Sequence, residues 1–199
     1  MSEKLKEQLG RYYSPETHPP TKARRPQNAR EDTWIIDLLG RVQVGYFATR
    51  WDQQTFINPS TFWYDTERHE IYFHSNQVGR IRANSERHDE VCFAASEVGK
   101  PLPSNIALEF SIQYRSIVAF GKIRVLSKKD EQEHALYGLI KKYFPTMIAG
   151  NEYRPITAEE LKRTSVYAIA VEYWSGKENW VERADQSDEW PALAASWFS

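Results

Sequence analysis

The side chains best suited to bind an anion lie together in residues 72–87, YFHSNQVGRIRANSER. The aromatic start predicts a strand through Phe73, and the pattern after Gly79 predicts a short basic helix. A helix N-terminus presents unpaired backbone N–H groups, and a glycine there lets a ligand approach the backbone closely. The Ser75 hydroxyl and the Arg80 guanidinium add donors that suit a phosphate. The spacing therefore predicts a phosphate site, with a solvated helix start carrying surface arginines as the alternative.

Composition predicts one globular domain with no general attraction for nucleic acid or for an anionic membrane. The chain has 199 residues, 41% of them hydrophobic, and a net charge of −1. The single cysteine, Cys92, excludes an intrachain disulfide, and the histidines show no metal-binding spacing, so we predict no metal site. No apolar run reaches the roughly 18 residues that span a bilayer. With no signal-peptide core at the N-terminus, we expect a cytoplasmic protein.

The predicted phosphate site belongs to a series of closely spaced strands. Helical periodicity and end signals predict four short helices, over residues 31–40, 78–87, 128–144 and 157–163. Alternating, aromatic and β-branched runs predict strands over residues 41–50, 55–65, 70–75, 90–97, 113–127 and 165–181, the last as a strand pair or one bent strand. Gly121 predicts a bend or bulge within its strand. Many strands with few helices favour a mainly β protein, an antiparallel barrel whose closure removes exposed edges.

The two ends of the chain differ from its middle. Residues 1–29 are polar and rich in proline, which predicts an extended arm with a short helix over residues 2–9. Residues 30–183 hold the predicted strands and form the main domain. Residues 184–199 form a tail that ends in Trp190, Trp197 and Phe198. Because free aromatic side chains favour association, we expect this tail to pack on the barrel or on a partner subunit.

Six segments give the chain a resemblance to a known family. They are GRVQVGYFATR, INPSTFWYD, IYFHSNQVGR, NSERHDEVCF, YRSIVAFGKIRVL and EYWSGKEN. With the basic lead-in TKARRPQNAR, the resemblance covers about residues 20–182. In this order and spacing they resemble the FMN-binding split barrels related to pyridoxamine 5′-phosphate oxidase, most closely the nitroimidazole-reductase-like branch. The resemblance implies a six-stranded antiparallel split barrel flanked by short helices. It also implies a homodimer that binds FMN in the groove between its subunits.

The resemblance assigns roles to individual residues. It implies that the FMN phosphate and ribityl chain are bound by His74, Ser75, Val78, Gly79 and Arg80. It places the backbone of Asn58, Pro59, Ser60 and Thr61 along the edge of the flavin ring. It also places Ser116 near the cofactor and Lys177 at the last turn beside the ring.

Two positions depart from the family pattern. Relatives commonly have a basic residue directly after the arginine, where this chain has Ile81, and Arg82 is the available substitute although it faces another side of the helix. Pro59 stands where the true oxidases have an arginine. Since their other substrate-binding residues are also missing, we do not expect the vitamin B6 reaction.

The resemblance implies an FMN-dependent oxidoreductase that passes electrons from a reduced nicotinamide to a small acceptor. His74 would lie beside the cofactor as a catalytic residue that contacts substrate or donates a proton, or it would only shape the turn. Lys177 would stabilise the reduced, anionic flavin. The alternatives are a flavin-binding sensor or store without turnover, and the same barrel with haem or the deazaflavin F420. An oligonucleotide-binding barrel is disfavoured by the net charge.

Overall fold

The computed structural model describes residues 16–22 and 25–198, so the helix predicted over residues 2–9 lies outside the described part. The strands are β1 (Ala29–Arg30), β2 (Gly45–Trp51), β3 (Gln54–Ser60), β4 (Trp63–Asp65), β5 (Glu70–Asn76), β6 (Glu90–Leu102), β7 (Ser111–Val125) and β8 (Thr164–Asn179). The helices are α2 (Asp32–Arg41), α3 (Arg80–Arg87), α4 (Lys129–Tyr143) and α5 (Ala158–Arg163), with 3-10 turns η1 (Pro26–Asn28) and η2 (Ala195–Phe198). The protein is therefore mainly β, as predicted.

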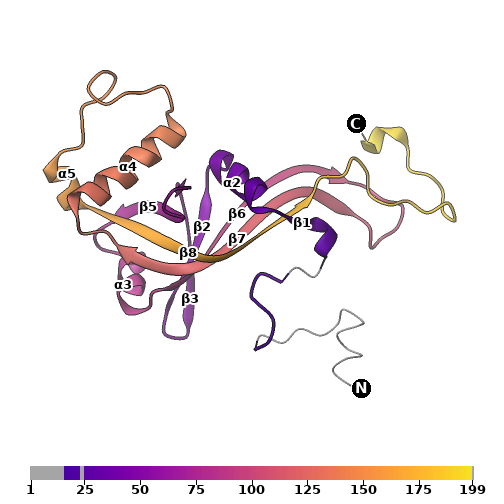
Figure 1. The fold of residues 1–199 in the computed structure, drawn as a ribbon. Coiled ribbons are helices and arrows are strands. Elements are labelled where there is room, and N and C mark those ends of the chain that lie inside the picture. Colours follow the sequence, from indigo (N-terminus) through magenta and orange to yellow (C-terminus); the bar gives the residue numbers. More distant parts are fainter. Residues whose placement is uncertain (1–15, 23–24, 199) are drawn as a thin grey trace.

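The strands form one antiparallel sheet in the order β3-β2-β6-β7-β8-β5-β4, and β1 also pairs with β8 (Figure 1). Six of these strands have seven residues or more, and they correspond to the six predicted ones. Among the described residues, hydrogen bonds do not close the sheet, so the expectation that closure removes its edges is wrong. β3 and β4 remain as edge strands because β4 pairs only with β5, at the other end of the order.

The last strand is a single element rather than a strand pair. The first part of β8 pairs with β5 and its last part pairs with β1, while β7 accompanies it along most of its length. The register between β7 and β8 shifts between Phe120 and Gly121, which confirms the predicted bulge. A side chain at Gly121 would overlap the carbonyl oxygen of Ala170, so the two backbones approach more closely there than other residues permit.

Two hydrophobic clusters lie on opposite faces of the sheet. The interior of the barrel is filled by aromatic and aliphatic side chains, among them Phe47, Phe73, Phe93, Ile117 and Tyr167. On the other face, α4 packs against a smaller cluster formed by Tyr72, Leu126, Ala135, Val166 and Ala168. Because side chains alternate along a strand, neighbouring residues of β5 contribute to different clusters.

A local sequence signal sets the start of α5. The capping box of α5 is present, because the Thr157 side chain accepts from the Glu160 backbone N–H while the Glu160 carboxylate accepts from that of Thr157. Helix α3 begins at Arg80, two residues later than predicted, and it covers one end of the barrel. There the buried Asn84 Nδ2 donates a hydrogen bond of 2.9 Å to Thr49 Oγ1.

The end of β6 and the start of β7 extend beyond the barrel as a two-stranded arm, where Pro101 pairs with Ile112 and Leu102 with Ser111. The C-terminal tail lies against this arm (Figure 1). Ser104 Oγ donates to the Asp185 carbonyl oxygen at 2.6 Å, and Asn105 Nδ2 donates to that of Ser187 at 2.8 Å. The tail therefore packs on the arm of its own chain. Trp190 nevertheless stays 67% exposed.

Within residues 16–22 and 25–198, no helix has the length and apolar character needed to cross a membrane.

Candidate functional site

The predicted phosphate site is a sharp turn between β5 and α3. The Val78 backbone N–H donates to Asn76 Oδ1 at 3.3 Å, and Gln77 Nε2 donates to the carbonyl oxygen of Lys162. Gly79 has a φ of 153°, in the region that favours glycine, and open space lies where a side chain would begin. Among the described residues, no side chain caps α3. Its first N–H groups are therefore available to an anion.

The two arginines of this helix differ in what they contact. The Arg80 guanidinium lies 4.4 Å from the centre of the Phe56 ring, and within the described residues no carboxylate pairs with it. Arg82 instead contacts the Glu86 carboxylate and donates to Ser165 Oγ at 3.1 Å. Arg80 is thus the guanidinium that remains available for phosphate. Arg82 faces another side of the helix, as its spacing predicts.

The residues predicted for the edge of a flavin ring lie on β3 and just after it. Pairing with β2 brings Asn58 opposite the buried Phe47 and Pro59 opposite Tyr46. Asn58 and Ser60 therefore face the barrel interior, as Phe56 does, while Pro59 faces outward. Because β3 is an edge strand of the sheet that residues 16–22 and 25–198 form, one side of its backbone has no strand partner there for its N–H and C=O groups. Thr61 directly follows Ser60, the last residue of β3. The Arg80 guanidinium contacts the Phe56 ring of β3, so Arg80 lies beside this edge.

The pleat of β5 separates the two polar residues that end it. Ser75 pairs with Ser165 and faces the barrel side, whereas His74 faces α4. His74 lines a cavity of about 480 Å³ between β5, α4, α5 and the loop that joins these helices. The other lining residues are Leu136, Leu139, Ile140, Tyr153, Arg154, Ile156, Glu160 and Thr164. Desolvation by these neighbours lowers the pKa of His74, although part of its surface is exposed, so its neutral imidazole is favoured at neutral pH.

Ser116 and Lys177 form a second group. They are direct cross-strand partners on β7 and β8, and both are half-buried. Trp174, three residues before Lys177, packs on the barrel core, so strand alternation places Lys177 on the outer face.

The two groups are far apart within one chain. Lys177 lies twelve positions along β8 from Ser165, the partner of Ser75, which is a path of about 40 Å along an extended strand. The β3 edge, beside which Arg80 of α3 lies, is four strands from β8, about 19 Å across the sheet. Strand β3 also directs Asn58 toward the barrel interior, whereas Lys177 lies on the outer face of the sheet. One chain therefore does not bring all the predicted binding residues to one ligand.

The outer face of the sheet is apolar between these groups. Tyr46 is 45% exposed, Ile57 67% and Tyr173 56%, and cross-strand pairing sets them beside Pro59 and Val118. A contiguous exposed apolar face of this kind is typical of an interaction surface.

One half-buried cation, Lys142, was not predicted from the sequence. Burial lowers the pKa of Lys142 to about 7. Its Nζ donates to the Leu39 carbonyl oxygen at 2.8 Å and lies 3.4 Å from the centre of the Phe62 ring. Lys142 belongs to a helix segment, IKKY, whose composition is typical of a solvated face, so no local pattern marks it as buried.

Comparison with known proteins gives a family and a fold. Residues 31–178 match the family model described as pyridoxamine 5′-phosphate oxidase. The flavocytochrome Anf3 from Azotobacter vinelandii has a TM-score of 0.75 and 20% identity, over 88% of this chain and 78% of that one. The FAD and heme binding protein from Mycobacterium smegmatis has a TM-score of 0.70 and 21% identity, over 80% and 76%.

A third similar structure, from Bacteroides thetaiotaomicron, is of a protein assigned to 5-nitroimidazole antibiotic resistance. It has a TM-score of 0.63 and 18% identity, and the match covers 75% of this chain and 86% of that one. No curated protein matches the chain. At these identities the solved structures establish the fold, and the family model covers most of the chain. The chain belongs to the pyridoxamine 5′-phosphate oxidase family.

Proposed function

We propose that the protein is a homodimeric flavoprotein oxidoreductase with FMN between its subunits. One chain would hold the flavin phosphate at the start of α3 through Arg80, and its β3 edge would run along the flavin ring. Ser116 and Lys177 of the partner subunit would complete the site. The observation that carries this proposal is the separation of the two groups, since only a second copy of the chain can supply the missing one.

The outer apolar face supports such an assembly. It lies on β2, β3, β6, β7 and β8, between the strand that carries Lys177 and the edge strand beside Arg80. Two copies that share this face would cover the exposed Tyr46, Ile57 and Tyr173. The same contact would bring the outward Lys177 of one copy toward the β3 edge of the other.

The protein's residues would position and tune the cofactor, which supplies the hydride and electron transfer when it is bound. Arg80 and the free N–H groups of α3 would neutralise the phosphate. A positive charge from Lys177 at the pyrimidine edge of the ring would favour the reduced, anionic form. His74, uncharged at neutral pH, would accept a proton from a substrate bound in the cavity beside α4.

A second candidate function is a flavoprotein that also binds haem. The observation that favours it is the His74 imidazole at the wall of an apolar cavity of about 480 Å³, since a neutral imidazole is a common axial ligand of haem iron. Arg154, which pairs with Glu160 at 2.8 Å, would offer a cation to haem propionates. Two similar structures, a flavocytochrome and an FAD and heme binding protein, carry haem according to their names.

The visible absorbance spectrum of the purified protein, before and after addition of FMN, FAD, F420 and haem, tests these proposals. Flavin bands that shift on binding support the flavoprotein, and oxidation of NADH by the loaded protein separates an enzyme from a sensor. A Soret band that disappears in His74→Ala supports the haem protein. A protein that ignores both flavins refutes the role of Arg80. Arg80→Ala should weaken FMN binding, because it removes the proposed phosphate contact, and Arg87→Ala, at the other end of α3, is the matched control.

A further inference from the structure

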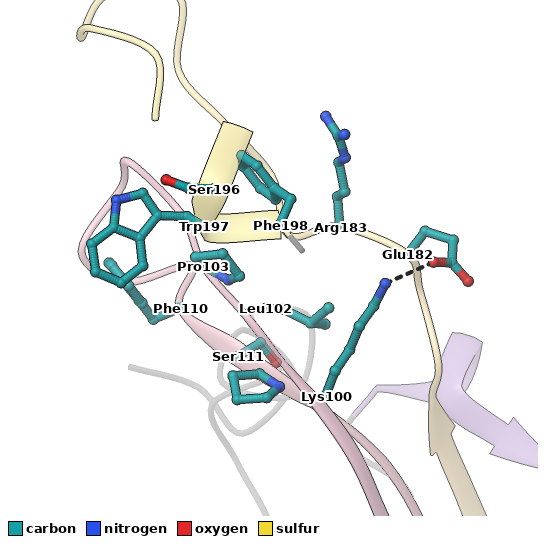
Figure 2. Close-up of a pocket in the computed structure, with 11 residues that line it drawn as sticks. Lys100, Leu102, Pro103, Phe110, Ser111, Glu182, Arg183, Ser196, Trp197 and Phe198 are labelled. Carbon is teal, nitrogen blue, oxygen red and sulfur yellow. Dashed lines mark hydrogen bonds and ion pairs between the residues drawn. The ribbon is translucent and has the colours of Figure 1, made fainter. Parts of the chain in front are cut away.

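A second cavity, of about 630 Å³, lies where the C-terminal tail crosses the β6–β7 arm (Figure 2). We call it the arm pocket. Its walls include Leu102 and Pro103 of the arm, the aromatic Phe110, and Trp197 and Phe198 of the tail. It is separate from the cavity that His74 lines, and none of the roles proposed above uses it.

The arm pocket combines aromatic surfaces with cations. Phe110 is 62% exposed and Trp197 is 67% exposed, so both rings present accessible faces. Lys100 Nζ pairs with the Glu182 carboxylate at 2.9 Å (Figure 2). The Arg183 guanidinium lies 4.5 Å from the centre of the Phe198 ring, and no carboxylate of the described residues pairs with it. Aromatic walls next to an available guanidinium suit a planar aromatic ring that carries a phosphate.

The position of the arm pocket relates it to the proposed flavin site. Ser111, in its wall, lies on β7 five residues before Ser116, a distance of about 17 Å along the strand. The two bases of an extended dinucleotide can lie about as far apart as Ser111 and Ser116. The odd spacing puts Ser111 and Ser116 on opposite faces of β7, so a dinucleotide with its adenine in the arm pocket would cross the edge of the two-stranded arm to bring its other base near Ser116 and Lys177 of the same chain.

We propose that the arm pocket binds the adenosine phosphate end of a dinucleotide. The geometry favours the reduced nicotinamide electron donor as its source. This assignment of the source rests on the proposed function, because it needs the flavin ring beside Ser116 and Lys177. FAD is the other possible source, but its phosphate would lie at Arg80 of the opposite chain. Its adenylate would then extend away from this arm.

Calorimetric titration with AMP tests the pocket without any flavin. AMP is expected to bind the wild-type protein, and Trp197→Ala is expected to weaken it about fivefold or more, the scale of one base–aromatic stack. Arg183→Gln should lower the affinity for AMP to that for adenosine, because only AMP carries the phosphate. Trp190→Ala is the matched control, since Trp190 is equally exposed in the same tail but does not line the arm pocket. Absence of AMP binding, or equal binding by all variants, would overturn the proposal.

A second experiment identifies the source of the adenosine phosphate. In the FMN-loaded protein, Arg183→Gln and Trp197→Ala should each raise the KM for NADH about fivefold or more. The KM for reduced nicotinamide mononucleotide, which lacks adenosine, should not change. A variant that instead weakens FAD and leaves FMN unaffected assigns the pocket to the cofactor and overturns the donor assignment, as does the absence of NADH oxidation. AMP binding by a protein that takes no flavin would refute the proposed function and leave the pocket assignment standing.

Discussion

A flavin site shared between two chains predicts that two defective variants restore each other. We would replace Arg80 with Glu in one preparation and Lys177 with Glu in another. The first change removes the proposed phosphate contact from one chain. The second removes the proposed contact to the ring from the partner subunit. Arg80 lies on α3 beside the β3 edge, whereas Lys177 lies on the outer face of β8, four strands away, so each site in the proposed dimer would need one residue from each chain.

The expected magnitudes follow from the strength of the contacts. A charge-assisted hydrogen bond contributes roughly 1.5–3 kcal/mol, so losing one weakens binding about tenfold to 150-fold. Reversing the charge adds repulsion of the phosphate or of the reduced ring, so each variant alone should bind little flavin where the wild type is saturated. Random mixing would make half of the dimers heterodimers, each with one intact site. The mixture should therefore recover about a quarter of the wild-type sites.

Refolding the two variants together from denaturant, followed by titration with FMN and detection by flavin fluorescence, measures this recovery. Each variant refolded alone is the control and should stay near its low starting value. Differently tagged chains show whether heterodimers form. Heterodimers without any recovery of binding would refute the shared site, and so would wild-type affinity in Lys177→Glu.

Three further predictions concern single residues. His74→Ala should retain flavin affinity, because His74 faces α4, but should change NADH turnover; loss of flavin would make it a cofactor-binding residue. The unfolded state holds the Lys142 proton up to pH 10.5 and the folded state only to about 7, so stability should rise with pH across this window. Lys142→Met should remove that rise and stabilise the protein by about 1–2 kcal/mol at pH 6 in urea unfolding, a value discounted for its partial exposure. Gly121→Ala should cost about 2–3 kcal/mol through overlap with Ala170, whereas Gly40→Ala, with open space around it, should not destabilise.

The helices could be predicted because their signals are local. The apolar stripe over 128–144 corresponds to α4, Lys129–Tyr143, and the capping box at Thr157 marks the start of α5. The bulge at Gly121 was also predictable, because a glycine inside a β-branched run marks a point where the backbone departs from regular pairing. Each of these features depends on residues within one or two turns of each other.

The arrangement of the strands could not be predicted in the same way. Strand order depends on pairs that are distant in the sequence, such as β5 with β8, and no local pattern encodes them. Barrel closure was expected from the general cost of free edges, yet this chain leaves β3 and β4 unpaired on one side. The opposite orientations of His74 and Ser75 follow from the pleat, but only once the strand is known to continue through Asn76.

The candidate site shows the same division between local and distant information. Its phosphate half is contiguous, from Ser75 to Arg82, so residue types and spacing were enough to propose it. Its other half, Ser116 and Lys177, came only from the resemblance, since 60 residues separate two side chains that the register makes neighbours. If the two halves meet only between subunits, flavin binding and dimerisation must be linked, because a ligand that needs both chains stabilises the dimer and is released when it dissociates. In that case the register of β7 against β8, which no single stretch of the sequence contains, would link flavin binding to dimerisation.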